Sequence, residues 1–176
     1  MKISFFCLLS ALSVSSATAE ETWPRFRGND GTGTSGAEAP THFGENTLRW
    51  SAPLPGPGSS SPAIWGDRLF ITGEDRQKHT VSLSCLNSKT GEKLWTKSME
   101  TGEYHVHQFN NTAASSPAVN QNAVIVSWFD GAKKVAMLSA YDHSWKRLWN
   151  CEIGDHQSQH GLNIPKQRRF KIRRHI

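Results

Sequence analysis

The sequence predicts an all-β fold built from repeated four-stranded units, and three observations lead to this prediction. Residues 85–95 read as a β-hairpin, because an apolar run is followed by a polar turn with Thr90 and Gly91 and then by a tryptophan. Residues 80–86 alternate between apolar and polar side chains, which is the period of a half-buried strand. Similar features return 55 residues later, so the hairpin belongs to a repeat.

Matching residues that stand 55 positions apart define the repeated unit. The matches are Ser61 with Ser116, Leu83 with Leu138, Cys85 with Ala140 and, one residue shorter, Trp95 with Trp149. Strands are predicted over residues 64–65, 68–72, 80–86, 123–129 and 135–140. Four short strands closed by a tryptophan are typical of a β-propeller blade, which buries its faces against neighbouring blades. We predict blades at 59–100 and 114–153, fewer than the roughly four to eight of a closed ring.

The N-terminus has the pattern of a secretory signal peptide over residues 1–19. Lys2 supplies the positive start, residues 3–14 form a short apolar run, and Ala17 and Ala19 form an A-x-A cleavage site. A membrane anchor is the alternative, but the apolar run is too short to span a bilayer. No later segment is long and apolar enough for a transmembrane helix, so the sequence predicts an exported protein of the periplasm or cell envelope.

The positive charge of the chain is concentrated in its last residues. The net charge is +5, yet residues 20–160 hold 13 basic and 15 acidic side chains, and residues 161–176 hold six basic and no acidic ones. A basic tail can bind nucleic acid or anionic membrane. The predicted export argues against a nucleic-acid partner, and we expect the tail to be disordered or irregular.

Two cysteines remain once the signal peptide is removed, Cys85 and Cys151. An oxidising compartment permits a disulfide between them. They occupy different positions of two different repeats, which favours two small buried thiols over a bridge.

The hairpin motif resembles the repeat of the PQQ-like β-propeller family, which reads A-x-D-x-x-T-G-x-x-x-W and whose indole docks on the neighbouring blade. Cys85, Asn87, Thr90, Gly91 and Trp95 fall on this pattern with the right spacing. Cysteine replaces the small alanine and asparagine replaces the aspartate. The resemblance implies that these five residues dock one blade against the next.

A second copy of the motif is present in a degenerate form. Ala140, Asp142 and Trp149 match it, but the copy is one residue short and lacks the Thr-Gly pair. Trp145 stands where the turn is expected, so we predict an altered turn at this point.

The resemblance extends over residues 23–161. The leader W-P-R-F-R-G-N-D-G is similar to the N-termini of exported family members of planctomycete type. Residues 20–58 are thus expected to form a segment leading into the blades, which we call the N-terminal arm, and residues 59–160 are expected to hold about two to three four-stranded blades. The pattern stops near Gly161, and we expect that the reading frame is lost there, which would make residues 161–176 foreign to the fold.

The resemblance leaves several functions open. Some family members are non-catalytic scaffolds, such as the lipoprotein of outer-membrane assembly, whereas quinoprotein dehydrogenases use pyrroloquinoline quinone (PQQ) with Ca²⁺, and others are sensors of membrane Ser/Thr kinases. The catalytic aspartate and calcium ligands of the dehydrogenases find no match here, and no G-x-S-x-G motif is present. We therefore predict a binding or scaffold module without cofactor.

Candidate ligand-facing residues lie in the loop between the two blades. His105, His107 and Asn110 occupy this loop, and loops of propellers line the face where binding occurs. The histidine pair lacks the third ligand that a zinc or copper site requires, so no metal site is predicted. We expect an unidentified protein or small ligand at this face.

Overall fold

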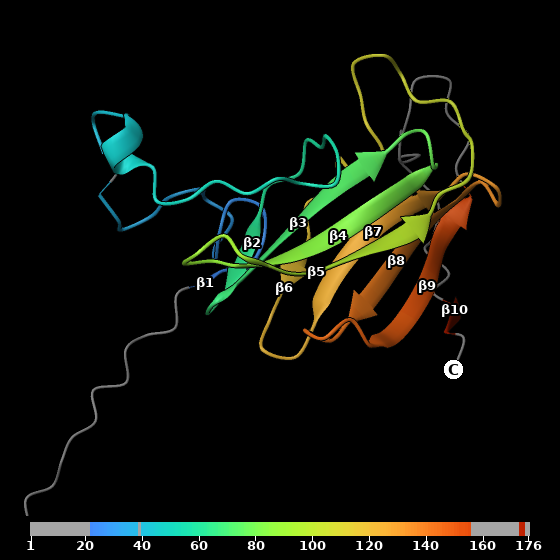
Figure 1. Cartoon of the computed structure of the whole chain (residues 1–176). Coiled ribbons are helices and arrows are strands. Elements are labelled where there is room, and N and C mark those ends of the chain that lie inside the picture. The colour runs from blue at the N-terminus through green and yellow to red at the C-terminus, as the bar shows by residue number, and fades with distance from the viewer. Residues whose placement is uncertain (1–21, 39, 156–172, 175–176) are drawn as a thin grey trace, which may run out of the picture.

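The chain folds into two stacked antiparallel β-sheets, which confirms the predicted all-β class and the partial propeller (Figure 1). The computed structural model describes residues 22–38, 40–155 and 173–174, so the predicted signal peptide lies outside the described residues. Within that part of the chain, the helical structure is one 3₁₀ turn, η1, at Glu45–Thr47. No helix in these ranges is long and apolar enough to cross a membrane.

The first sheet contains five strands in sequence order, β1-β2-β3-β4-β5. Their bounds are β1 Thr22–Trp23, β2 Ala63–Trp65, β3 Arg68–Asp75, β4 Thr80–Asn87 and β5 Lys93–Glu100. Strand β3 extends beyond the predicted residue 72, because Gly73 and Glu74 continue the backbone pairing with β4 although they break the apolar pattern. Cys85 pairs with Phe70 on one side and with Trp95 on the other, so the three side chains share one face.

The second sheet repeats this arrangement with the order β10-β9-β8-β7-β6. Its strands are β6 Ala118–Val119, β7 Val124–Asp130, β8 Val135–Tyr141, β9 Arg147–Asp155 and β10 Arg173–Arg174. No alternation in the sequence indicates β10, which pairs antiparallel with β9 because backbone groups at an open strand edge accept a partner of almost any sequence. The other residues of the predicted irregular tail lie outside the described residues.

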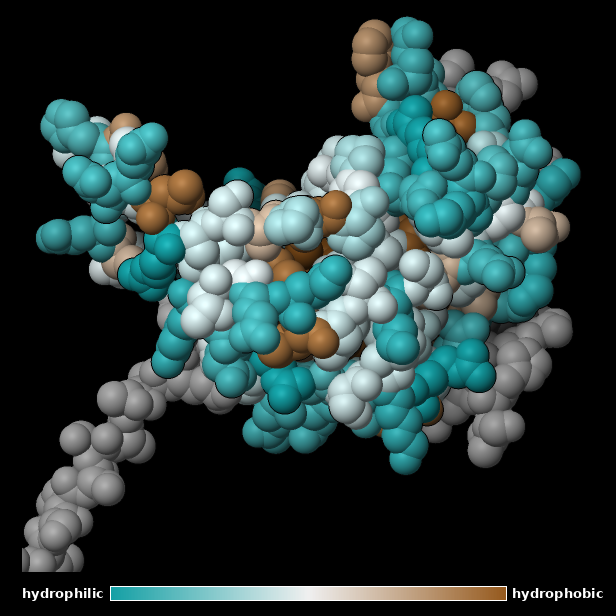
Figure 2. All heavy atoms as spheres, viewed as in Figure 1, coloured by the Kyte–Doolittle hydropathy of each residue, from teal (hydrophilic) through white to brown (hydrophobic). Residues whose placement is uncertain are grey.

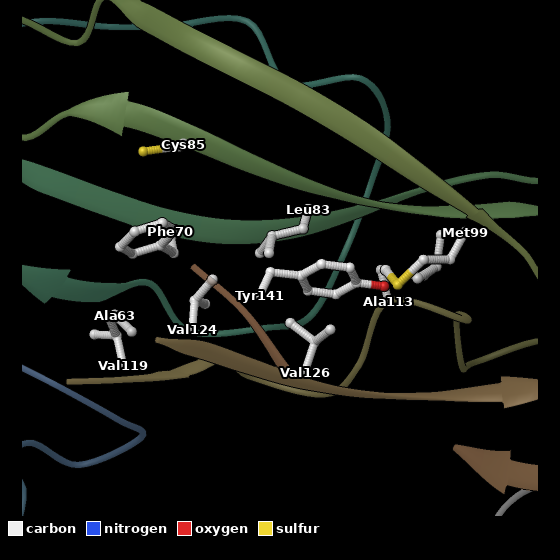
Figure 3. Packing of buried hydrophobic residues seen from close by; sticks show 11 residues of the cluster. Ala63, Phe70, Leu83, Cys85, Met99, Ala113, Val119, Val124, Val126 and Tyr141 are labelled. Carbon is white, nitrogen blue, oxygen red and sulfur yellow. The ribbon is translucent and has the colours of Figure 1, made fainter. Parts of the chain in front are cut away.

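The hydrophobic core lies between the two sheets (Figure 3). The first sheet contributes Ala63, Phe70, Val81, Leu83, Cys85 and Met99, and the second contributes Val119, Val124, Val126 and Tyr141. These positions alternate along each strand, and therefore point to one face. The removal of these apolar side chains from water holds the two sheets together.

The inner ends of the two sheets are joined by polar contacts between repeat-related residues. The backbone N–H of Ser61 donates to the hydroxyl of Ser116, its counterpart 55 residues later, at 2.8 Å. The N–H of Val119 donates to the carbonyl of Pro24 at 2.8 Å, so the start of the arm bridges both sheets. The sheets therefore meet along β2 and β6 as two neighbouring blades do.

Both cysteines of the described chain are free thiols. Cys85 is fully buried in the core, where burial raises the pKa of its thiol to about 11. Cys151 is half-buried, because its face of β9 is turned away from the first sheet. The structure thus agrees with the prediction of two separate thiols. The prediction that both are buried holds for Cys85 and not for Cys151.

Candidate functional site

One polar junction ties β5 of the first sheet to the turn between β8 and β9 of the second. The indole N–H of Trp95 donates to the carbonyl of His143 at 3.0 Å, and the guanidinium of Arg68 donates to the same oxygen at 2.7 Å. The imidazole of His143 lies 5.4 Å from the ring of Phe70 and 2.8 Å, at Nε2, from the carbonyl oxygen of Asn120. His143 thus contacts both sheets through its backbone and its side chain.

The turn that receives Trp95 has an unusual backbone at Trp145. This residue has a φ of 73°, a conformation that non-glycine residues rarely adopt. Its ring stacks on Tyr141 at 3.7 Å and lies 5.5 Å from the ring of Trp95. The side-chain oxygen of Asp142 accepts hydrogen bonds from Ser144 and from the N–H of Lys146. The turn therefore differs from the Thr-Gly form, as the sequence predicted. Trp145, its residue with positive φ, also contacts the rings of Tyr141 and Trp95.

The corresponding turn of the first sheet has the motif's usual residues. The Asn87 side chain accepts the N–H groups of Lys89 and Thr90, and Gly91 adopts the left-handed conformation with a φ of 74°. A side chain at position 91 would collide with the ring of Trp50. Glycine is required here both for the backbone conformation and for the close approach of an indole.

Trp50 of the N-terminal arm contacts this turn as Trp95 contacts the other. Its indole N–H donates to the carbonyl of Ser88 at 3.1 Å. Ser88 stands 55 residues before His143, the acceptor for Trp95. Trp50 of the arm therefore contacts a turn of the first sheet in the same way that Trp95 of the first sheet contacts a turn of the second.

Trp149 is the counterpart of Trp95 in the second sheet, and its surroundings differ. Its side chain is 41% exposed, and no residue in the described ranges accepts its indole N–H, while Ala140 beside it is fully buried. The neighbouring Leu148 is 47% exposed. Of the two motif tryptophans, only Trp95 is thus engaged with another sheet within the described chain.

A second feature lies at the opposite end of the strands, where residues 101–117 connect the sheets (Figure 1, yellow loop). A pocket of about 240 Å³ opens between this loop and the turn that joins β3 to β4. Its lining residues are Asp75, Arg76, His79, Thr80, Thr101, Gly102, Glu103, Tyr104, Val106 and Thr112. The lining is mixed in charge, and its polar groups come from both the loop and the first sheet.

A buried carboxylate attaches the loop to the sheet. The Glu74 side chain is only 1% exposed; Oε1 accepts Arg76 at 2.6 Å, and Oε2 accepts the N–H and hydroxyl of Thr112 at 2.7 and 2.9 Å. Arg76 also donates to the carbonyl of Asn110 at 2.7 Å. Burial alone would raise the pKa of Glu74, but the hydrogen bonds from Thr112 and the Arg76 guanidinium hold it below its ordinary value.

Tyr104 connects the loop to the second sheet. Its ring meets Phe129 edge-on at a centroid distance of 4.7 Å and lies against the backbone of Gly131. Burial, with a smaller contribution from the Glu74 carboxylate, raises the pKa of Tyr104 to about 12. The loop is thus fixed to both sheets, and its shape is set by the blade pair.

The predicted rim residues lie on this loop but outside the pocket lining. His105 is exposed, and His107 accepts the N–H of Phe109 at Nδ1 and lies 5.4 Å from its ring. Val106, between the histidines, lines the pocket, as alternation in an extended segment requires. Asn110 uses its carbonyl to accept Arg76, so its role in the structure is to position the loop.

The residues that sequence reasoning missed are Trp50, Arg68, Glu74 and Tyr104. A leucine shortly before the tryptophan was a signal for Trp50, because Leu48-Arg49-Trp50 resembles the endings Leu94-Trp95 and Leu148-Trp149. Glu74 gave no signal, since a glutamate in a strand ordinarily faces solvent. Its role depends on Thr112, which is 38 residues away.

The fit of the quinone cofactor with Ca²⁺ can be judged from the ligands present. Calcium takes about six to eight oxygen ligands. Within residues 22–38, 40–155 and 173–174, no group of three or more His, Cys, Asp or Glu side chains is placed to hold a metal ion.

Two four-stranded repeats, β2–β5 and β6–β9, pack face to face, lie in contact along β2 and β6, and are joined by Trp95 at a turn of the second sheet; this arrangement defines a partial β-propeller. The chain belongs to the PQQ-like repeat family: the family profile described as "Outer membrane protein assembly factor BamB" matches residues 44–157, well over half of the chain. No curated protein matches the chain.

Proposed function

We propose that this protein is an exported, non-catalytic scaffold module that binds a protein partner through the loop of residues 101–117. The observation that carries the proposal is the attachment of the loop by Glu74, which binds Thr112 and Arg76 while it is itself buried. Binding loops held by a rigid scaffold are a common functional arrangement, because little ordering is needed on association.

The loop offers a suitable contact for a protein. Phe109 lies in a turn of the loop and is 87% exposed, so its aromatic side chain can enter a pocket on the partner. The polar lining of the neighbouring pocket, with Asp75, Arg76 and Glu103, supplies hydrogen-bonding groups for the rim of such an interface. The description of the matched family as an outer membrane protein assembly factor supports a scaffold role in the cell envelope.

Site-specific photo-crosslinking tests this proposal. A photoreactive phenylalanine analogue replaces Phe109 in one variant and Phe43 in a control, since Phe43 is similarly exposed, at 84%, but lies in the N-terminal arm. Irradiation in envelope preparations should give a discrete protein adduct at position 109, which excess unlabelled protein competes away and which is absent at position 43. Identical adducts at both positions, or none at position 109, would contradict the proposal.

The enzymatic alternative has its own test. Purified protein is incubated with PQQ and Ca²⁺, and retained quinone and dye-linked alcohol oxidation are measured. We expect neither stoichiometric retention nor turnover. Retention of one quinone per chain together with oxidation would replace the scaffold proposal by a dehydrogenase.

A further inference from the structure

Each docking tryptophan of this chain contacts a turn in the sheet that follows it, except the last. Trp50 donates to Ser88 at 3.1 Å, and Trp95 donates to His143 at 3.0 Å. The two acceptors stand 55 residues apart, so the contacts are equivalent in the repeat. Trp149 is the next member of the series, and in the described part of the chain it has no such turn to contact.

The outer face of the second sheet carries residues that are equivalent, in the repeat, to those that the first sheet buries against the second. Four of the six core residues of the first sheet are Ala63, Phe70, Leu83 and Cys85. The residues 55 positions later are Ala118, Ile125, Leu138 and Ala140. They are all apolar, and by alternation they point away from the first sheet, since Val124, Val126 and Tyr141 point toward it. The second sheet thus carries a docking face with Trp149 at its edge.

The far face of the first sheet carries residues that are equivalent, in the repeat, to those with which the second sheet packs on the first. The second sheet packs on the first through Val119, Val124, Val126 and Tyr141. The residues 55 positions earlier are Ile64, Leu69, Ile71 and Leu86, again all apolar. They lie on the side of the first sheet away from the core, where Leu86 is already buried and the other three are partly exposed. Figure 2 shows hydrophobic atoms among polar ones over β3 to β5.

We propose that the outer face of the second sheet docks on the far face of the first sheet in another copy of this chain. In this contact Trp149 of one copy takes the place of Trp50 at Ser88 and Gly91 of the next. The contact uses different surfaces of the two copies, so it is head-to-tail and can repeat from copy to copy. The template is the packing already present between the two sheets within one chain.

Trp50 controls this contact because it already occupies the acceptor turn. The surrounding arm is held loosely, since residues 40–49 and 53–55 are exposed and Trp50 itself is only half-buried. Segments with few buried contacts open at a low free-energy cost. The N-terminal arm is therefore a competitor that must leave Ser88 before Trp149 of another copy can bind. This inference concerns surfaces other than the loop of residues 101–117 and is independent of the proposed function.

Sedimentation velocity of the full chain over a range of concentrations tests the inference. Removing the competitor in Trp50→Ala should lower the apparent dissociation constant for self-association at least about tenfold relative to the unmodified chain, because the binding-competent fraction rises. The double variant Trp50→Ala/Trp149→Ala should lose this gain. Far-UV circular dichroism confirms that each variant retains its sheets.

A matched variant separates docking from non-specific association. Gly91→Ala also displaces Trp50, because the new side chain collides with its ring, but the same collision excludes Trp149 of another copy. We expect Gly91→Ala to remain as weakly associated as the unmodified chain. The inference is overturned if Trp50→Ala shows no gain, if the double variant associates as strongly as Trp50→Ala, or if Gly91→Ala associates as Trp50→Ala does.

Discussion

The indole nitrogen of Trp95 lies 3.0 Å from the backbone oxygen of His143 and thereby joins a strand of the first sheet to a turn of the second. A backbone carbonyl cannot be removed by mutation, so the tryptophan is the member of the pair whose contribution can be measured. The repeat supplies an internal control in Trp149, which has the same place in its own sheet and is 41% exposed.

Replacing Trp95 by alanine should lower the free energy of unfolding by about 3 kcal/mol, because the change removes a large packed ring from the contact between sheets. The matched change Trp149→Ala should cost less than about 1 kcal/mol, as expected for a side chain with little packing. Urea denaturation of both variants measures the difference. Equal losses would show that the two tryptophans have equivalent surroundings.

Gly91→Ala should destabilise the chain by at least about 1 kcal/mol, since a φ of 74° is unfavourable for alanine and its methyl group would meet the ring of Trp50. Gly36→Ala is the control, because a side chain there has open space around it. Limited proteolysis should cut the N-terminal arm faster in Gly91→Ala than in the control. Unchanged cleavage would mean that Trp50 does not hold the arm.

The Glu74 carboxylate should make stability fall in acid. Its pKa is lower in the folded chain than in the unfolded one, so its contribution is present above the ordinary glutamate pKa of about 4.3 and is lost as the pH falls through the folded value. Glu74→Gln should cost about 1–3 kcal/mol at pH 7, because hydrogen bonds to a buried charged group are lost.

Urea denaturation at pH 7 and at a pH below 4 measures this effect. The difference between the unmodified chain and Glu74→Gln should shrink at the lower pH, whereas Glu92→Gln, at an exposed carboxylate, should have little effect at either pH. A difference that stays constant with pH would show that Glu74 contributes by its shape and not by its charge.

The two thiols should differ in reactivity toward an alkylating reagent at pH 8. Cys85 is fully buried with its pKa raised to about 11, so little thiolate is present or accessible, whereas Cys151 is half-buried. Mass spectrometry after brief alkylation should find Cys151 modified at least about ten times faster. In Cys151→Ser, labelling should require unfolding, and rapid labelling of that variant would place Cys85 at the surface.

The sequence predicted the strands well because their signals are local. Alternation over residues 80–86 and the turn at Asn87 to Gly91 depend on neighbours in the chain, and both are present in the structure. The resemblance identified the family from the same local motif. The blade pairing followed from the 55-residue repeat, which is also a property of the sequence alone.

The candidate site was harder to predict because its contacts are between distant residues. Glu74 and Thr112 are 38 residues apart, and Trp50 and Ser88 are also 38 residues apart, with no periodicity linking either pair. The loop containing His105, His107 and Asn110 was identified correctly as a loop between the sheets, but which of its side chains line the pocket depends on how Glu74 holds it.

The two repeats pack as neighbouring blades with their inner ends in contact, and a crosslink between these ends tests this packing most directly. The backbone N–H of Ser61 donates to the hydroxyl of Ser116 at 2.8 Å, so the two residues are in direct contact and are a suitable pair for a cysteine crosslink. Ser61→Cys and Ser116→Cys are combined in a chain carrying Cys7→Ser, Cys85→Ala and Cys151→Ser, and a second chain on the same background pairs Ser61→Cys with Ser144→Cys in the turn between β8 and β9. Mild oxidation should form an intramolecular disulfide in the first chain and not in the second. Failure of the first pair to bridge, or equal bridging of both, would contradict this packing.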